Sequence, residues 1–366
     1  MNILFFANPK SVHDRNWMQF IANDPRYRCF CISRKIHADF NVDSLGNIIY
    51  LGALPDFSII RFWQPIGGLI RIYQLLRKNK IDIFHIIYAE PNALWAMGRT
   101  FYKVPMILTT RGTDVLKAIP KHFEKTDLLQ KIIQFLYKKS LRSFSTITST
   151  SQRQIDSIKS LGIFSDFRVV RTGVHVEAIS KSVERLSIDK PFILFPRLMK
   201  PIYNHEFSIA AIGLLSDSTK SSYTMVFLDK DSKQSDYVER ISGLIEKSLD
   251  VDFLFLDRVQ EKELFDLYRQ ASLCVMNPIS DGSPVSAMEA MYFNTPLILG
   301  PLEYDADIFG EITKLESWDP SELSGLMEEK LRLTEKPNTK SIILEKGNRQ
   351  KEMNKLCQIY ERLLNQ

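Results

Sequence analysis

Short apolar runs rich in Ile, Val and Phe alternate along this chain with longer stretches that have the apolar spacing of helices. This alternation is typical of parallel-sheet α/β architecture, because each parallel strand needs a crossover helix to reach the next one. At 366 residues the chain is long enough for two cores of common size. The sequence therefore predicts an α/β protein with two Rossmann-like domains.

The alternation occurs in two series, separated by a polar stretch at residues 180–190 that lacks apolar periodicity. We expect one domain over residues 1–182, a second over 190–340, and a closing helix over 341–366. Strands of the first series are predicted at Ile3–Ala7, Arg28–Ser33, Asn47–Leu51, Ile81–Ile87, Met106–Thr110, Phe144–Thr148 and Phe167–Arg171. Those of the second are predicted at Phe192–Phe195, Thr224–Leu228, Phe253–Leu256, Leu273–Met276 and Leu297–Leu299, with helices that include Tyr203–Leu215 and Glu261–Gln270.

Composition excludes some classes of protein and leaves others open. The N-terminus runs directly into a strand pattern, with no basic leader and no apolar run near twenty residues, so we expect a cytoplasmic protein. Cys29, Cys31, Cys274 and Cys357 are badly spaced for disulfides or a metal and are predicted to be reduced core residues. A net charge of +5 suits a nucleic acid, an anionic membrane or a phosphorylated substrate, and does not choose among them.

Residues 281–296, Asp-Gly-Ser-Pro-Val-Ser-Ala-Met-Glu-Ala-Met-Tyr-Phe-Asn-Thr-Pro, carry most of the functional information. They follow the strand predicted to end at Met276, and a helix is expected to begin near Pro284. The N–H groups at a helix N-terminus form an anion site, and phosphate is its common occupant. Further along the same helix, the Glu289 carboxylate can accept hydrogen bonds from ribose hydroxyls. The predicted donor-binding residues are Gly282, Ser283, Pro284, Val285 and Ser286; a capped helix with a solvated Glu289 is the alternative.

This segment resembles the signature of group 1 (family four) retaining glycosyltransferases, in which an acidic residue and a glutamate are separated by seven residues. The two acids here are Asp281 and Glu289, and Thr295-Pro296 opens the next strand. In that family the first acid contacts the donor sugar and the second binds ribose. The first acid is usually glutamate, so Asp281 reaches one methylene less far.

The resemblance covers the chain in outline and is strongest between Phe192 and Pro301. It implies the GT-B fold: two facing Rossmann-like domains, the donor site in the second, and a final helix that crosses back to the first. It also implies a nucleotide-diphosphate sugar as co-substrate, with UDP-sugar favoured, retention of configuration, and no metal or cofactor. A glycan or lipid-linked glycan is the implied acceptor, in polysaccharide or cell-surface glycan assembly.

Two cations follow the predicted strand Phe192–Phe195. Arg197 would project from the carboxyl end of the sheet, where open α/β sheets bind ligands, and its planar guanidinium suits phosphate oxygens. The resembled family has a Lys-Gly pair further on, whereas this chain has Lys200 followed by Pro201. With Asp281 and Glu289, Arg197 and Lys200 are the predicted catalytic residues; an exposed surface lysine is the alternative for Lys200.

The first domain offers candidates for the acceptor side. The loop Thr109–Asp114 resembles the Gly-Ser/Thr-Asp loop that the family places opposite the donor, although a structural turn capped by Asp114 is the alternative. The loop after the first strand contributes His13 and Arg15. His85 lies near a strand end, where a core histidine is the other interpretation. The predicted acceptor-side set is His13, Arg15, His85, Arg111, Gly112 and Asp114.

One stretch of the first domain has a basic amphipathic pattern. Between Lys117 and Arg142, Lys121, Lys125, Lys131, Lys138 and Lys139 are interleaved with Leu, Ile and Phe. Such a helix can lie against anionic lipid, or can be an ordinary packed helix with a solvated basic face. The partners expected from the sequence are therefore a sugar nucleotide, a glycan acceptor and an anionic membrane surface, with no nucleic acid.

Three other functions are alternatives to sugar transfer. A nicotinamide-dependent oxidoreductase lacks support, because neither half has Gly-x-Gly-x-x-Gly after its first strand. A non-catalytic or degenerate sugar-nucleotide-binding protein is kept open by Asp281 and by the missing Lys-Gly pair. An epimerase or hydrolase on the same fold would form product without an acceptor.

Overall fold

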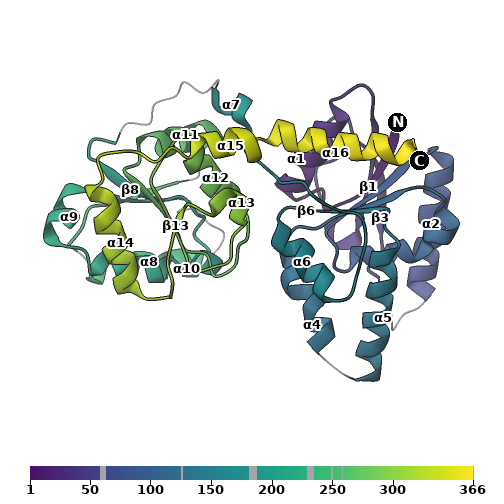
Figure 1. Cartoon of the computed structure of the whole chain (residues 1–366), viewed down its shortest axis with the longest axis horizontal. Coiled ribbons are helices and arrows are strands. Elements are labelled where there is room, and N and C mark those ends of the chain that lie inside the picture. The colour runs from purple at the N-terminus through teal and green to yellow at the C-terminus, as the bar shows by residue number, and fades with distance from the viewer. Residues whose placement is uncertain are drawn as a thin grey trace. The chain divides into compact units, whose positions relative to one another are not determined.

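The computed structural model describes residues 1–57, 63–124, 127–180, 188–228, 235–248, 250–257 and 259–365. It divides into two compact units: unit 1 is Met1–Thr172 with Gln350–Gln366, and unit 2 is Gly173–Arg349. Each unit contains one sheet with helices packed against it (Figure 1). The prediction of an α/β protein with two Rossmann-like domains is confirmed.

Unit 1 contains a seven-stranded sheet in the order β3-β2-β1-β4-β5-β6-β7, and every pair in it is parallel. The strand order reverses beside β1, which pairs with both β2 and β4, and such a point is where open α/β sheets bind ligands. All seven strands were predicted, with bounds shifted by a few residues. They are β1 (Asn2–Phe6), β2 (Arg28–Arg34), β3 (Ile49–Leu54), β4 (Ile83–Ile87), β5 (Met106–Thr109), β6 (Thr146–Ser149) and β7 (Phe167–Val169).

Two apolar cores cover the two faces of this sheet. One contains side chains of α2 (Trp63–Lys78), η3 (Asn92–Gly98), α3 (Arg99–Tyr102) and α5 (Leu128–Arg142). The other contains side chains of α1 (Val12–Ala22) and of the C-terminal helix α16 (Arg349–Leu364). Helix α16 therefore belongs to unit 1 from Gln350 onward, although it follows unit 2 in the chain.

Unit 2 contains a six-stranded parallel sheet in the order β10-β9-β8-β11-β12-β13. Five strands have the predicted bounds: β8 (Phe192–Phe195), β9 (Thr224–Leu228), β10 (Phe253–Leu256), β11 (Leu273–Met276) and β12 (Leu297–Leu299). The sixth, β13 (Thr313–Lys314), was not predicted, because two residues carry no periodicity. The helices are α7 (Val176–Ser180), α8 (His205–Gly213), α9 (Asp217–Ser222), α10 (Ser235–Ser248), α11 (Glu261–Gln270), α12 (Val285–Tyr292), α13 (Ala306–Phe309), α14 (Pro320–Arg332) and α15 (Lys340–Lys346).

The boundary between the units differs from the one expected near residue 182, which lies outside the described residues. Unit 2 begins at Gly173, where φ is +65° and a Cβ would approach the backbone of Arg349 to 2.7 Å. Val174 then forms an isolated parallel bridge with Asn348. This pairing places the stretch before α7 in unit 2.

The expected closing helix over 341–366 is two helices. Helix α15 ends at Lys346 and α16 begins at Arg349, because the backbone between them pairs with Val174: Val174 N donates to Gly347 O and Arg349 N donates to Val174 O. Ile343 of α15 lies in the core of unit 2. Only the second half of the expected helix therefore packs with unit 1.

The expected basic helix between Lys117 and Arg142 is also divided, into a π-helical turn η4 (Asp114–Ala118), α4 (Ile119–Glu124) and α5. Asp127 starts α5 by accepting a hydrogen bond from Gln130 N. Helix α4 packs back on α5, with His122 stacked on Tyr137 at 5.4 Å between ring centroids. Lys125 lies outside the described residues.

All four cysteines are free and buried, as predicted. Within the described ranges no helix combines the length and the hydropathy needed to cross a bilayer.

Candidate functional site

The segment that carries the sequence signature forms a strand, a turn and a helix in unit 2. Strand β11 ends at Met276, and α12 begins at Val285 with Pro284 as its N-cap residue. No side chain caps this helix, so its first N–H groups are available to a ligand. Asp281 shapes the turn: its Oδ1 accepts hydrogen bonds from Gly282 N at 2.8 Å and Ser283 N at 3.3 Å.

Arg197 lies directly against this turn. It follows β8, and its Nη2 donates to Asp281 Oδ2 at 3.0 Å while its Nη1 donates to Ser286 Oγ. The guanidinium also lies over the ring of Tyr203, 4.2 Å from the centroid. The predicted residues Arg197, Asp281 and Ser286 are therefore in direct contact at the carboxyl end of the sheet.

Glu289 lies one turn further along α12, and its environment disfavours the charged carboxylate. Burial and the nearby Glu261 raise its pKa to about 7, while Arg349, Tyr268 and Arg197 act in the opposite direction. Its side chain is partly exposed. The raised pKa favours the neutral acid more than in a free glutamate, and a ligand that donates hydrogen bonds to it would favour the carboxylate.

Several buried polar atoms around the turn have no protein partner within the described residues. They are Asn277 Oδ1, Ser283 Oγ and Tyr304 OH. Buried polar groups are nearly always hydrogen-bonded, so such a concentration is typical of a site completed by a ligand or water. None of Asn277, Tyr203, Tyr268 and Tyr304 was predicted from the sequence, although Asn277 directly follows a strand and could have been found by that position.

Two predicted residues of unit 2 contribute less than expected. Lys200 is the N-cap residue of the short helix η5 (Pro201–Tyr203), and its side chain makes no hydrogen bond or ion pair with Arg197, Asp281 or Ser286. Gly282 has no heavy atom within 4 Å of a built Cβ, so the fold itself does not require glycine there. The side of the turn at Gly282 is open space.

In unit 1 the loop after β5 is organised by Asp114. Its buried carboxylate accepts from the backbone N–H groups of Ala89, Arg111, Gly112 and Val115, at 2.6 to 3.0 Å. Burial raises its pKa, and these hydrogen bonds oppose the shift. The expected acceptor contact is wrong for Asp114, because it is completely buried and the loop amides occupy its oxygens.

Gly112 shapes the backbone of this loop, whereas Arg111 makes side-chain contacts with α1. Gly112 adopts φ +109°, a conformation that side chains rarely take. The Arg111 guanidinium stacks on Trp17 at 4.3 Å and pairs with Asp14 at 3.3 Å. Its Nε and Nη1 are buried without a partner among the described atoms, and burial lowers its pKa.

His85 is a core residue, so its assignment to the acceptor side is wrong. It is completely buried, with Nδ1 at 2.6 Å from Tyr360 OH and Nε2 at 2.7 Å from Thr109 Oγ1. Burial and the charge of Arg111 lower its pKa to about 3, so the ring is neutral. The remaining two candidates lie near the start of α1: His13 is exposed, and Arg15 donates to Pro9 O.

Comparison with known proteins agrees with this arrangement. Residues 2–151 match the family described as glycosyl transferase 4-like, and residues 177–311 match the family described as glycosyl transferases group 1. The two matches together span most of the chain, which belongs to the group 1 glycosyltransferases with the GT-B fold. No curated protein matches.

Solved structures share the fold at low sequence identity. A glycosyltransferase from Rickettsia africae is 12% identical with a TM-score of 0.78, and the match covers 99% of this chain and 98% of that one. Sucrose-phosphate synthase from Thermosynechococcus elongatus is 15% identical with a TM-score of 0.72, covering 100% and 99%. Anabaena HepE in complex with UDP and glucose is 13% identical with a TM-score of 0.71, covering 99% and 100%.

Proposed function

We propose that this glycosyltransferase moves a sugar from a nucleotide-diphosphate sugar to an acceptor hydroxyl with retention of configuration. The observation that carries the proposal is the contact of Arg197 with Asp281 and Ser286 beside the uncapped start of α12. A guanidinium and a row of helix N–H groups together bind and neutralise a diphosphate. Glu289, further along the same helix, is placed to accept hydrogen bonds from the ribose.

The chemistry that follows from this arrangement is mainly electrostatic. As the bond between the sugar and the diphosphate breaks, negative charge develops on the leaving oxygen, and Arg197 with the α12 N–H groups stabilises it. We expect no metal or other cofactor to be needed for this step, since the cation is part of the chain. Activity that survives EDTA would support this expectation, and loss of activity restored by a divalent ion would contradict it.

The donor and acceptor are proposed at the level of chemical class. UDP-sugars are the favoured donors, and the structure of Anabaena HepE with UDP and glucose supports trying these first. The acceptor is a glycan or lipid-linked glycan, in cell-surface polysaccharide assembly at the cytoplasmic face of a membrane. His13, Arg15, Arg111 and Gly112 remain the proposed acceptor-side residues.

Nucleotide binding can be tested by a thermal-shift titration with UDP, GDP and their sugars. A ligand that binds only the native state raises the melting temperature with concentration, by an amount equivalent to about 2.7 kcal/mol at one hundred times Kd. We expect wild type to respond to one nucleotide and Arg197→Ala and Glu289→Ala to lose the response. Lys314→Ala, on the exposed edge strand β13, is the matched control and should respond like wild type.

Turnover separates the enzyme from a degenerate binding protein. Release of the nucleoside diphosphate that depends on an added acceptor would establish transfer, whereas binding without turnover would leave a non-catalytic sugar-nucleotide protein. If no nucleotide raises the melting temperature of the folded wild type, the proposed donor site is wrong.

A further inference from the structure

Three helices of unit 1 share an unusual charge composition. Helices α2, α3 and α5 contain eight of the chain's 48 Lys and Arg residues and none of its 43 Asp and Glu residues. The remainder of the chain therefore carries 40 basic residues against 43 acidic ones. The net positive charge of the protein comes from these helices.

Helix α5 exposes large apolar side chains beside its cations. Leu128 is 77% exposed, Phe135 is 63% exposed and Ile132 is 43% exposed. Their spacing of four and three residues places them on one stripe of the helix, and Lys139 continues the same stripe. The opposite side of α5 is buried in the core through Tyr137 and Leu141. The exposed stripe is therefore a surplus apolar surface that the fold does not use.

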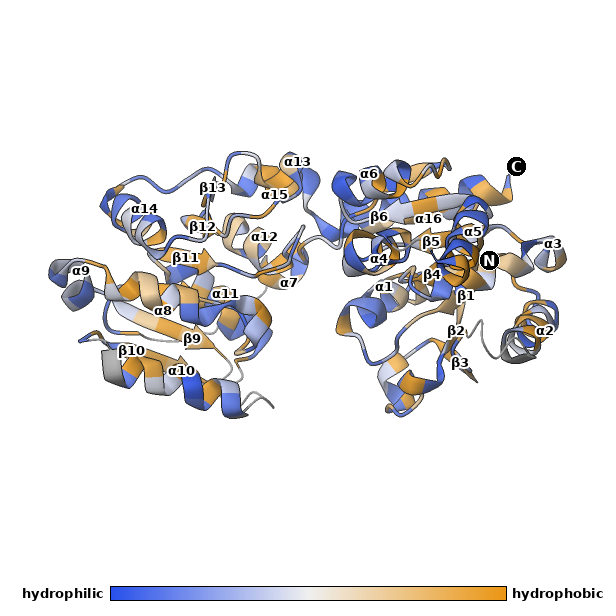
Figure 2. Cartoon of the chain, turned by 90° about the horizontal axis from the view of Figure 1, so that it is seen from below, coloured by the Kyte–Doolittle hydropathy of each residue, from blue (hydrophilic) through white to orange (hydrophobic). Residues whose placement is uncertain are grey.

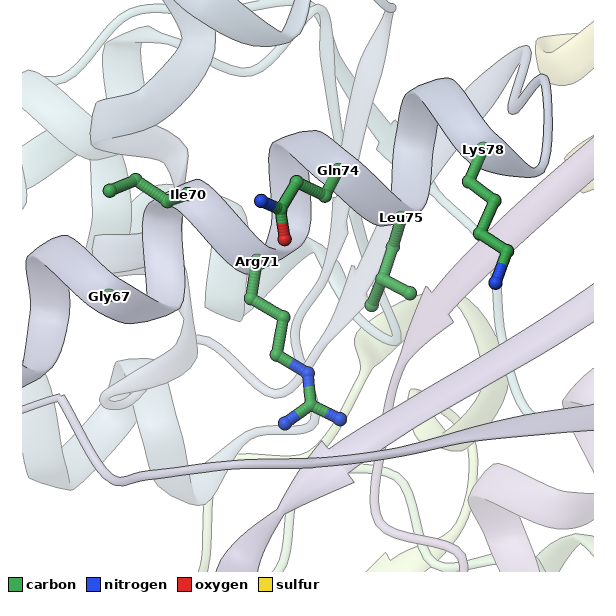
Figure 3. A pocket seen from close by; sticks show the side chains of 6 residues that line it. All are labelled: Gly67, Ile70, Arg71, Gln74, Leu75 and Lys78. Carbon is green, nitrogen blue, oxygen red and sulfur yellow. The ribbon is translucent and has the colours of Figure 1, made fainter.

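Helices α2 and α3 also expose large apolar side chains beside cations. Ile66 and Ile70 of α2 are each 52% exposed, and Phe101 of α3 is 69% exposed. Along α2 runs an open hollow of about 390 Å³, which combines aliphatic carbon with two cations (Figure 3). Its lining residues are Gly67, Ile70, Arg71, Gln74, Leu75 and Lys78.

The three helices lie on one face of the unit 1 sheet. Helix η3 packs against α2, α3 and α5, and all of them share one apolar core, whereas α16 belongs to the core of the other face. Figure 2 shows apolar and polar residues interleaved along α2 and α5. We call the exposed side of α2, α3 and α5 the basic apolar face.

We propose that the basic apolar face binds the surface of an anionic lipid bilayer. Helices that present Lys and Arg together with Leu and Phe lie at the boundary between head groups and acyl chains, where phosphates meet the cations and the apolar side chains enter the hydrocarbon. Exposed apolar residues gathered on one face mark an interaction site rather than ordinary surface. The proposal does not depend on the chemistry of the donor site in unit 2.

Charge decides which partner fits this face. A second copy of the chain would bring two acid-free basic helix faces together, and like charges at short range repel. A bilayer that contains phosphatidylglycerol supplies both the negative charge and the apolar medium.

The test is sedimentation of the full chain with vesicles of phosphatidylcholine, with and without 40 mol% phosphatidylglycerol, at low and at 0.5 M salt. We expect binding to the anionic vesicles that falls with salt. The variant Lys131→Gln/Lys139→Gln should bind roughly tenfold to thirtyfold more weakly, from about 1 kcal/mol for each cation near an anionic surface. The variant Leu128→Ser/Phe135→Ser should bind the anionic vesicles more weakly by about tenfold or more.

Matched controls come from unit 2. Lys314→Gln/Lys346→Gln removes two exposed cations, and Leu214→Ser/Leu333→Ser removes two exposed apolar side chains, 59% and 57% exposed. Both controls should bind vesicles like wild type, and all variants should melt within a few degrees of it. The proposal is overturned if wild type does not bind anionic vesicles, if the α5 variants bind as well as the controls, or if the face mediates self-association that the α5 variants abolish.

Discussion

Arg197 and Asp281 form an ion pair across 84 residues of sequence, with 3.0 Å between Nη2 and Oδ2. Their side chains are 17% and 19% exposed, so the pair is largely shielded from water. Asp281 has a second task, because its Oδ1 accepts from Gly282 N and Ser283 N. One carboxylate therefore orients the cation and shapes the turn that precedes α12.

This double role predicts the effect of lengthening the side chain. Asp281→Glu should lose the two short-range hydrogen bonds to the turn, since their geometry depends on the short side chain. We expect a loss of about 1 kcal/mol and a fall in melting temperature of roughly 2–4 °C. Asp281→Asn keeps an oxygen acceptor for these bonds, so its melting temperature should fall less. A Glu variant as stable as wild type would show that the turn does not depend on Asp281.

The raised pKa of Glu289 predicts that its contribution to stability falls as the pH rises. Its folded pKa of about 7 lies above the ordinary value of 4.5, so its contribution to stability is complete below pH 4.5 and is lost as the pH rises through 7. Glu289→Gln should therefore be more stable than wild type at pH 8, by about 1–3 kcal/mol, and equal to it at pH 4. Urea unfolding at both pH values measures the difference, with Glu345→Gln on the exposed side of α15 as control. A variant less stable than wild type at pH 8 would contradict the assigned environment.

Asp114 predicts a stability defect in unit 1 with no direct effect on ligands. Asp114→Asn replaces one acceptor oxygen by an amino group that faces backbone N–H groups, which are left buried without an acceptor. We expect unfolding to become easier by about 2–4 kcal/mol. The Ala89 and Gly112 amide protons should exchange with solvent faster in this variant, as measured by hydrogen–deuterium exchange. The exposed neighbour Thr113→Ala should leave both measurements unchanged, and unchanged amide exchange in the Asn variant would contradict this role.

The lowered pKa of His85 predicts that this residue accounts for part of the acid sensitivity of the protein. Its pKa of about 3 in the folded state lies below the ordinary 6.5, so its contribution is complete above pH 6.5 and is lost as the pH falls toward 3. At pH 4 this loss amounts to about 3 kcal/mol. His85→Gln removes the titrating group and should flatten the decline in unfolding free energy between pH 6.5 and 4. The decline due to His205, whose pKa burial lowers to about 4, should remain. An unchanged decline would mean that His85 is accessible to protons in the native state.

Periodicity predicted most of the fold, because buried parallel strands are almost continuously apolar. The five strand bounds predicted in unit 2 match the structure, whereas the two-residue β13 offers no pattern to detect. The closing helix over 341–366 was predicted unbroken, whereas the structure has two helices, Lys340–Lys346 and Arg349–Leu364. Its interruption depends on a bridge to Val174, which is distant in sequence.

The candidate site could be predicted only where its residues share a local motif. Asp281, Ser286 and Glu289 lie in one short segment, and Arg197 closely follows a predicted strand. Tyr203, Tyr268 and Tyr304 resemble ordinary aromatic residues in sequence, and only folding brings them to the turn. The environment of His85 depends on Tyr360, which is 275 residues away, so its position near a strand end could not show that it faces the core.

The return of α16 to unit 1 also determines the order in which the two cores can be completed during synthesis. Unit 2 has all its residues once Arg349 has been added, but the core of unit 1 still lacks Met353, Leu356 and Tyr360. Until those last residues emerge from the ribosome, that face of the first sheet is covered by α1 but not by α16, and His85 lacks the Tyr360 hydroxyl. The unit that begins first in the chain is therefore the one that finishes last, and a truncation before Gln350 would leave unit 2 intact and unit 1 open.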